Sequence, residues 1–336
     1  MTIKQNLLQR LRTGAGGESF VQELSAALTG TITRTPEDAE LLLGLTQQAW
    51  IADQRNPAAS RARDAAQQLI ELLPNLQDGY RALGLAHLSR REYREAFMAF
   101  TAAGRIGGAV NLDNFKALAQ NLMLGTTQAR FQFGAHSYVF DLSCHNAAAI
   151  EAGAFHSVGV LTELDELQAL EHIAQGRTIA SIVEVGVLMG NHTAFFLKAF
   201  KPARLTLADA DPANMPFIES TVRNNAVTVP QLNMVNAFVG RGGGETVFAG
   251  QRVPHKSLAE IVTSPIDLLK IDVDGAELAL LESADSVVTL GRPLVMIETT
   301  PETHRPALEW FAARSYDALQ SFDHGDYINT FFRSRS

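Results

Sequence analysis

The second half of the chain alternates between short apolar segments and longer segments with helical spacing. The apolar segments cover residues 181–186, 204–210, 232–239, 266–273 and 293–299. Alternation of this kind predicts an α/β fold in which helices cover both faces of a mostly parallel sheet. Two more candidate strands, 318–322 and 327–332, flank the tetrapeptide DHGD. This spacing predicts a hairpin, so the sheet should close with an antiparallel last strand at its edge.

The first part of the chain is predicted to be helical. Alanine and leucine dominate residues 36–125, and the segment carries no strand-like alternation. Six residues within 78–104 fall at the spacings of a tetratricopeptide repeat: Tyr80, Leu83, Gly84, Ala96, Phe100 and Ala103. The alternative is a plain helical hairpin. The next segment, FQFGAHSYVFDLS, predicts a β-hairpin. We therefore expect a helical, tetratricopeptide-like domain over residues 1–127 and a second domain over 128–336.

The turn in VEVGVLMGNHT, residues 183–193, narrows the choice of cofactor. A phosphate-binding P-loop needs a lysine after its last glycine, and a dinucleotide turn needs three glycines spaced as GxGxxG. This turn has only Gly186 and Gly190, and the carboxylate of Glu184 would repel a diphosphate. S-adenosylmethionine instead carries a sulfonium, an ammonium and a ribose diol, which suit acidic partners. The candidate cofactor contacts in this turn are Glu184, Gly186, Gly190 and Asn191.

The next two strands end in residues that suit the rest of such a cofactor. Asp209 ends the second strand, 23 residues after Gly186. That separation is close to the offset of about 20 residues at which an acidic side chain binds ribose hydroxyls in nucleotide-binding α/β folds. Asn236 and Ala237 end the third strand, where a polar or small residue would flank an adenine. We expect all three residues to contact the cofactor.

The stretch IDLLKIDVDGAE, residues 266–277, runs from an apolar strand into the carboxylates of Asp272, Asp274 and Glu277. The fifth strand, PLVMIET, also ends in a carboxylate, Glu298. Carboxylates crowded this closely raise the pKa of at least one of them unless cations are near, and ligands of open α/β sheets bind beyond the carboxyl ends of the strands. Three uses stay open: a general base for a hydroxyl, a Mg²⁺ site formed by Asp272 and Glu298, or helix caps and scaffold for the cofactor site.

Composition excludes several classes of protein. The net charge of −8 and the pI of about 5.6 argue against wholesale binding of nucleic acid. Cys144 is the only cysteine, so no internal disulfide forms. The N-terminal segment lacks the apolar core of a secretion signal, and no run approaches the roughly 18 apolar residues of a membrane span. We expect a cytoplasmic protein without a membrane span.

Four motifs between residues 130 and 336 resemble the FkbM-type S-adenosylmethionine-dependent methyltransferases: VEVGVLMGNHT, DPANMPFIESTVRNN, LLKIDVDGAE and PLVMIE. The resemblance implies a class I Rossmann-like methyltransferase that acts on oxygen, typically a hydroxyl of a saccharide or natural product. It implies cofactor roles for Glu184, Gly186, Gly190 and Asp209, and active-site roles for Asp272, Asp274 and Glu277. Three positions depart from the family pattern: Glu184 replaces an aspartate, Ala210 a proline and Asp274 a glutamate.

The sequence thus predicts an S-adenosylmethionine-dependent O-methyltransferase that aligns donor and acceptor for in-line transfer. Its catalytic candidates are Asp272, Asp274, Glu277 and Glu298, and Mg²⁺ is an option rather than an expectation. Its acceptor would be a small molecule or a glycan, and the helical domain would bind a protein partner or a second copy of the chain. Two alternatives stay open: a catalytically silent helical scaffold whose second half binds cofactor, and an NAD-dependent sugar-modifying enzyme.

Overall fold

The computed structural model describes residues 2–13, 16–28, 35–53, 60–107, 111–143, 146–225, 228–248 and 250–335. Cys144 lies outside these ranges. The chain divides into two compact units. The first comprises Met1–Arg130 with Asp141–Val160, and the second comprises Phe131–Phe140 with Leu161–Ser336. The domain boundary expected between residues 127 and 128 stays a prediction.

The first unit is built from helices. They are α1 (Ile3–Arg12), α2 (Glu18–Leu28), α3 (Pro36–Asp53), α4 (Arg61–Leu72), α5 (Gln77–Ser89), α6 (Tyr93–Ile106), α7 (Leu112–Met123) and α8 (Ala147–Ser157). Leucines at helical spacing form its core, in which Leu24 of α2 is buried together with Leu41 and Leu42 of α3. The helical character predicted for residues 36–125 is confirmed.

Helices α5 and α6 approach each other closely where Gly84 meets the ring of Phe100. A Cβ added at Gly84 would lie 2.5 Å from the nearest ring carbon of Phe100, so only glycine fits there. Ala96 of α6 is also buried. The helical hairpin is therefore present, and its assignment as a tetratricopeptide repeat stays a prediction.

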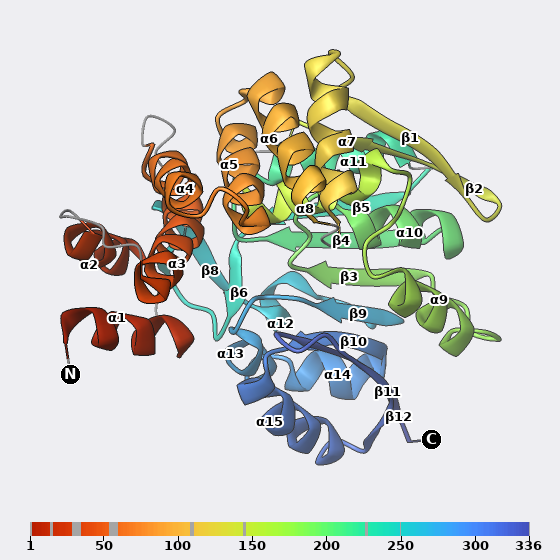
Figure 1. Ribbon diagram of the computed structural model, residues 1–336. Coiled ribbons are helices and arrows are strands. Elements are labelled where there is room, and N and C mark those ends of the chain that lie inside the picture. The colour runs from red at the N-terminus through yellow and green to blue at the C-terminus, as the bar shows by residue number, and fades with distance from the viewer. Residues whose placement is uncertain are drawn as a thin grey trace. The chain divides into compact units, whose positions relative to one another are not determined.

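The second unit contains a seven-stranded sheet with the strand order β11-β12-β10-β9-β3-β4-β5. Its strands are β3 (Ser181–Val185), β4 (Arg204–Asp209), β5 (Gln231–Asn236), β9 (Leu268–Ile271), β10 (Leu294–Thr299), β11 (Tyr316–Asp323) and β12 (Ile328–Ser334). The neighbours β10, β9, β3, β4 and β5 are parallel to one another, and β12 is antiparallel to both β10 and β11. The predicted α/β class with a mostly parallel sheet and an antiparallel last strand is confirmed (Figure 1).

The sequence predicted that the antiparallel strand would lie at the edge of the sheet, and this prediction is wrong. Strand β12 lies between β10 and β11, and β11 forms the edge. The distribution of apolar residues explains this order. Thr330, Phe331 and Phe332 of β12 are buried, whereas most of β11 is exposed. The more apolar strand therefore takes the interior position.

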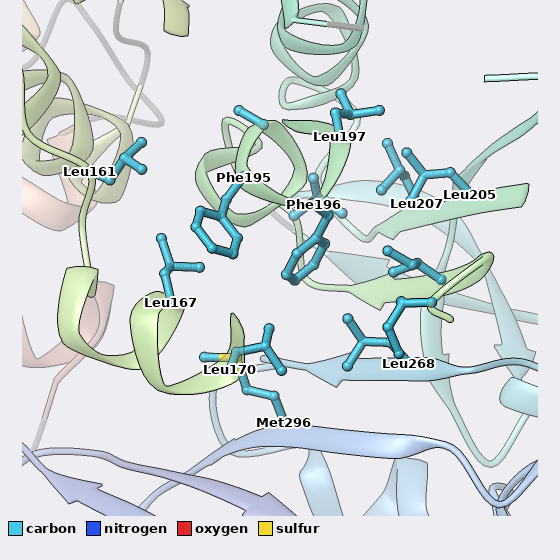
Figure 2. Packing of buried hydrophobic residues seen from close by; sticks show 14 of the residues in the cluster. Leu161, Leu167, Leu170, Phe195, Phe196, Leu197, Leu205, Leu207, Leu268 and Met296 are labelled. Atoms are coloured by element: carbon cyan, nitrogen blue, oxygen red, sulfur yellow. The ribbon is translucent and has the colours of Figure 1, made fainter. Parts of the chain in front are cut away.

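Helices cover both faces of this sheet because successive side chains of a strand point to opposite faces. Ile182, Leu268 and Met296 belong to one core, with α9 (Leu164–Ile173), α10 (Asn191–Ala199) and α11 (Met215–Asn225) packed on it. Figure 2 shows Phe195 and Phe196 of α10 in this core, with Leu268 and Met296 on the strands. The residues that follow on the same strands face a second core, which α12 (Leu258–Ile261), α13 (Glu277–Leu281), α14 (Asp285–Gly291) and α15 (Pro301–Ala312) cover.

Two small sheets accompany the main one. The predicted hairpin is confirmed by β1 (Gln128–Phe133) and β2 (His136–Asp141). A three-stranded sheet, β6 (Phe238–Gly240), β7 (Glu245–Phe248) and β8 (Gln251–Ser257), was not predicted. The predicted strand 232–239 is therefore divided between two sheets. β5 ends at Asn236 in the main sheet, and β6 belongs to the small sheet.

None of the helices in the described ranges combines the length and the apolar character that crossing a membrane requires.

Candidate functional site

The topology brings the predicted site residues to one edge of the main sheet. Strands β3, β4, β5, β9 and β10 are parallel, so their carboxyl ends lie at the same edge. Helix α10 begins just after β3, at this edge. The turn between β11 and β12 lies there as well, because Thr299 at the end of β10 pairs with Ile328 at the start of β12. Ligands of open α/β sheets bind at this edge.

The glycine turn after β3 needs both of its glycines. Gly186 has a φ of +79°, and an added Cβ would lie 1.5 Å from the carbonyl oxygen of Asp272. Gly190 has a φ of +81° and precedes α10. Asn191 fastens the turn to the segment before α9, since its side-chain amide exchanges two hydrogen bonds with the backbone of Thr162, of 3.1 and 3.0 Å. The turn therefore presents a rigid backbone at the start of a helix, where free N–H groups accumulate.

Asp209 holds this turn in place. One carboxylate oxygen accepts hydrogen bonds from the N–H groups of Val187 and Leu188, at 3.0 and 2.8 Å. The other accepts from the N–H of Asp211 and from the amide of Asn214, at 2.8 and 2.9 Å. Burial raises the pKa of Asp209, although these four hydrogen bonds favour the charged form. The residue predicted to bind ribose thus also shapes the glycine turn.

Asn236 and Ala237 join the end of β5 to the end of β4. The side-chain amide of Asn236 donates to the carbonyl oxygens of Asp209 and Ala210, at 3.0 and 3.3 Å. The N–H of Ala237 donates to the carbonyl oxygen of Asp209, at 3.0 Å. The two predicted adenine neighbours therefore lie next to the predicted ribose ligand.

A buried lysine, which the sequence analysis did not single out, compensates the carboxylates. Lys270 of β9 is 2% exposed and is the direct neighbour of Glu184 on β3, which is fully buried. Its ammonium donates to Oδ2 of Asp272 at 2.6 Å and to the carbonyl oxygen of Gly186 at 3.2 Å. Burial lowers the pKa of Lys270, but the charges of Asp272 and Glu184 outweigh burial and raise it. Lys270 is therefore a permanent cation below the glycine turn.

Glu184 is the least solvated of these carboxylates. Thr193 of α10 donates a hydrogen bond of 2.5 Å to its Oε2. Its Oε1 is buried and has no hydrogen-bond partner among the described residues. Burial raises the pKa of Glu184, and the ammonium of Lys270 opposes this rise. An unpaired oxygen in this position suits a cationic or hydrogen-bonding group.

Three of the four catalytic candidates meet at the strand ends. Asp272, Asp274 and Glu298 each offer a carboxylate oxygen, and these oxygens lie within 4.8 Å of one another. Burial, together with the charge of Asp272, raises the pKa of Glu298 to about 9, and the same two causes raise the pKa of Asp274. Glu298 is thus protonated at neutral pH. Carboxylates grouped in this way suit a hard cation, an ammonium or a sulfonium.

Glu277 is not part of this cluster. It is buried, its Oε1 accepts a hydrogen bond of 2.6 Å from the N–H of Gly275, and its Oε2 accepts one of 3.0 Å from the hydroxyl of Thr303. Both oxygens are therefore engaged in joining the turn after β9 to the start of α15. These contacts favour the scaffold role among the uses that the sequence left open.

Residues from distant parts of the sequence complete the edge. Glu163 precedes α9, and its Oε2 lies 2.9 Å from Nε2 of His192 on α10. Burial raises the pKa of Glu163, but the charges of His192 and Lys270 outweigh burial and lower it to about 2. Asn329 of β12 pairs with Glu298 and is 1% exposed, and both polar atoms of its side chain are unpaired among the described residues. No sequence pattern indicates that Glu163 and Asn329 belong to the site. The one signal for Lys270 is its position within an apolar strand.

The raised pKa of Glu298 predicts a pH-dependent stability. A carboxyl group that titrates at about 9 in the folded protein and at 4.5 when unperturbed stabilises the fold fully below pH 4.5. That contribution is lost progressively as the pH rises toward 9. We expect Glu298→Gln to raise the Tm of the metal- and cofactor-free protein at pH 8 by about 2–4 °C or more and to change it little near pH 4.5. Thermal unfolding of Glu298→Gln and of the exposed control Glu302→Gln across this pH range tests it, and equal Tm differences at both pH values would contradict it.

Comparison with known proteins finds a family match that covers part of this edge. Residues 190–318 match the family described as the methyltransferase FkbM domain. No curated protein sequence matches the chain.

Several solved structures resemble the chain. One is the methyltransferase FkbM from Methylobacillus flagellatus KT, with 14% identity and a TM-score of 0.42 over 74% of this chain and 71% of that one. Another is precorrin-6y C5,15-methyltransferase from Geobacter metallireducens GS-15, with 10% identity and a TM-score of 0.39 over 53% of this chain and 92% of that one. TYW2 from M. jannaschii, in complex with AdoMet, shows 8% identity and a TM-score of 0.36 over 62% and 87% of the two chains.

The family match covers α10, the ends of β4 and β5, the acidic end of β9 and the end of β10, whereas β3 with Glu184 and Gly186 precedes it. Residues 190–318 thus match a methyltransferase FkbM domain, and the chain is a methyltransferase.

Proposed function

We propose that the chain is an S-adenosylmethionine-dependent O-methyltransferase that acts on a hydroxyl of a saccharide or natural product. The negative character of the sheet edge carries the proposal. The carboxylates of Asp272 and Asp274 meet there beside the protonated carboxyl group of Glu298, and the ammonium of Lys270 is already bound to Asp272. An edge of this kind attracts a sulfonium and an ammonium and repels a diphosphate.

The residues at this edge fit the cofactor. The rigid turn from Gly186 to Gly190 would hold it against the backbone, Asp209 would bind the ribose, and Asn236 and Ala237 would flank the adenine. The unpaired, buried Oε1 of Glu184 supports a cationic neighbour in this part of the site. When bound, S-adenosylmethionine supplies an electrophilic methyl group on a positively charged sulfur.

The protein would contribute mainly by orientation. Holding the acceptor oxygen in line with the carbon–sulfur bond turns a bimolecular step into an effectively unimolecular one, which supplies much of the rate of such reactions. Asp272 and Asp274 would accept hydrogen bonds from the acceptor hydroxyl and keep its oxygen in place. Glu277, whose two oxygens are engaged, would support the turn that carries Asp274.

A Mg²⁺ ion held by Asp272, Asp274 and Glu298 is a second way for this cluster to act, since three oxygen ligands of this kind suit a hard cation. The ion would lower the pKa of a bound acceptor hydroxyl. Treatment with EDTA separates the two mechanisms. Unchanged turnover after EDTA would reject the Mg²⁺ mechanism. Complete loss of turnover that added Mg²⁺ restores would establish it.

Calorimetry and turnover test the proposed function together. S-adenosylmethionine should bind the full chain, and S-adenosylhomocysteine should form with a hydroxyl acceptor from a panel of free monosaccharides, nucleotide sugars and phenolic glycosides. Asp209→Asn should weaken cofactor binding by about 10- to 100-fold, because it leaves a buried N–H group without an acceptor. Asp272→Asn should instead reduce kcat by about 100-fold, because the acceptor oxygen is no longer held in place, and should change cofactor affinity much less.

Asp211→Asn is the matched control for the cofactor site, since Asp211 lies two residues after Asp209 and its side chain accepts only from the N–H of Ala213 among the described residues. Equal loss of affinity in both variants would reject a specific role of Asp209 in the cofactor site. Binding of S-adenosylmethionine without turnover across the panel would favour the scaffold alternative. Tight binding of NAD without binding of S-adenosylmethionine would establish the alternative of an NAD-dependent sugar-modifying enzyme.

The helical unit would serve recognition. We propose that the tetratricopeptide-like helices, in a domain ending near residue 127, bind the acceptor, a protein partner or a second copy of the chain. Sedimentation of the full chain over a range of concentrations tests self-association.

A further inference from the structure

A histidine and a buried glutamate form a pair at the carboxyl edge. His324 lies in the turn between β11 and β12, and Glu166 lies in the first turn of α9. The Nε2–H group of His324 donates a hydrogen bond to Oε1 of Glu166. Glu166 is 2% exposed. A carboxylate this deeply buried requires a charged or hydrogen-bonding partner, and a residue 158 positions away in the sequence provides it.

The strand register places this pair beside the acidic cluster. Glu298 of β10 pairs with Asn329 of β12. Tyr327 directly precedes β12 and lies two residues before Asn329. Both polar atoms of Asn329 are buried and unpaired among the described residues, which leaves a polar group without a protein partner at this place. The charges of Glu163 and Glu298 act on Tyr327, so the turn that it ends lies near the cluster.

Tyr327 connects the pair electrostatically to the cluster. Its ring stacks on the imidazole of His324, with centroids 4.5 Å apart and planes inclined by 22°. Burial, followed by the charges of Glu163 and Glu298, raises the pKa of Tyr327. The phenol thus lies within reach of the carboxylates of the site, and the stacked imidazole lies next to it. The hydrogen bond to Glu166 and the stacking together fix the orientation of the imidazole.

The carboxylates of the cluster are engaged with one another and with Lys270. Oxygens of Asp272, Asp274 and Glu298 lie within 4.8 Å of one another, and Asp272 binds the ammonium of Lys270 at 2.6 Å. Histidine is the side chain whose protonation changes near neutral pH. Because Nε2 of His324 carries the hydrogen that binds Glu166, its basic nitrogen is Nδ1, which has no partner within the described ranges of the chain.

We propose that His324 is the general base that takes the proton of the acceptor hydroxyl, and that Glu166 is the positioning residue that orients its imidazole. This inference rests on the proposed transfer of a methyl group to oxygen. The hydroxyl proton goes to Nδ1 of His324, and the electron pair of the oxygen forms the new bond to carbon. The carbon–sulfur bond of the sulfonium breaks with its electron pair left on sulfur, so the positive charge ends on the imidazolium. Glu166 stabilises that charge.

Several charged and titratable groups lie around His324. They are Glu163 and Glu166 from the start of α9, and Tyr327, Asp323 and Asp326 from its own turn. Among them, Glu166 makes the direct hydrogen bond. Removing its charge should therefore destabilise the imidazolium that forms when Nδ1 takes the proton.

Nuclear magnetic resonance tests the pair in the cofactor-free protein. In protein labelled at the histidine ring carbons, the His324 signal is identified by its loss in His324→Ala. We expect the ring signals of His324 to move in Glu166→Gln, because the imidazole loses the carboxylate that accepts its Nε2–H, and to stay unchanged in Glu171→Gln, an exposed control on the same helix. Identical ring signals in the wild type and both variants would overturn the positioning role.

Turnover tests the base itself, with whichever hydroxyl acceptor of the panel the wild type methylates. His324→Ala should lower kcat by about 10²- to 10⁴-fold with the same affinity for S-adenosylmethionine, and added imidazole should restore about tenfold or more of that loss. In Glu166→Gln the acidic limb of the pH profile should move to lower pH. His172 is an exposed histidine of α9, and His172→Ala serves as the control. Its kcat and its pH profile should match those of the wild type.

The outcomes separate this inference from the proposed function. A wild type that methylates no acceptor of the panel would reject the proposed function and, with it, the role of His324. A wild type that turns over while His324→Ala turns over equally, or is inactive without rescue by imidazole, would reject the base alone. Loss of kcat with rescue and a shifted pH profile would establish it.

Discussion

Replacing Lys270 by methionine is expected to destabilise the second unit by about 3–5 kcal/mol, the typical cost of leaving a buried charge without its partner. Methionine keeps the length of the side chain but removes the ammonium that binds Asp272 and the carbonyl oxygen of Gly186. Glu184, which is fully buried beside it, would lose its nearest cation. The cluster of carboxylates would then have to take up protons for the fold to persist at neutral pH.

Tryptophan fluorescence measures this loss in one unit alone. The chain has two tryptophans, of which Trp50 belongs to α3 in the first unit and Trp310 to α15 in the second. In a Trp50→Phe background, urea titration followed through Trp310 reports the second unit. Lys198→Met is the matched control, since Lys198 is partly exposed and has no carboxylate partner among the described residues. Equal midpoints for the two variants would mean that Lys270 does not compensate the buried carboxylates.

Replacing Gly186 by alanine should be as damaging, for a steric reason. The added Cβ would lie 1.5 Å from the carbonyl oxygen of Asp272, so the backbone of the turn or of β9 would have to move. The positive φ costs an alanine about 1–2 kcal/mol, and the overlap adds about 1–3 kcal/mol or more. We expect S-adenosylmethionine binding to be abolished, because the turn and the end of β9 shape the same edge.

Gly176→Ala isolates the steric part of this effect. Gly176 has a φ of +78°, almost equal to that of Gly186, but an added Cβ would meet nothing within 4 Å. Both variants therefore carry the same backbone strain, and only Gly186→Ala carries the overlap. Calorimetry with S-adenosylmethionine and the Trp310 urea titration compare the two. Similar losses in both variants would show that strain, rather than the contact with Asp272, makes glycine necessary at position 186.

The main sheet could be predicted from the sequence because its strands are buried on both faces. Buried parallel strands are continuous apolar runs, and the predicted segments 181–186 and 293–299 match β3 and β10 within one residue. The small sheet β6-β8-β7 could not be predicted, since β7 is mostly exposed and β8 contains Pro254, so neither carries an apolar pattern. The place of β12 was missed because a hairpin spacing predicts pairing with β11 but not which of the two strands joins β10.

The candidate site was predictable to the extent that strand ends determine it. Asp272 and Asp274 follow β9, and Glu298 lies at the end of the parallel neighbour β10, so their convergence follows from the topology. The contacts that distinguish their roles depend on partners far away in the sequence. Glu277 is engaged by Thr303, and Glu166 by His324, and no periodicity connects such positions. Lys270 was overlooked because a single lysine does not interrupt the apolar pattern of a strand enough to mark its burial.

The interior position of β12 has a consequence for how the enzyme is made. Until residues 328–334 have left the ribosome, the apolar strand β10 has an open side with unpaired backbone groups. Such a side invites pairing with other nascent chains. The segment that closes this side of β10 is continuous with the turn that carries His324. A chain that lacks β12 would therefore lack both the cover of β10 and the proposed base.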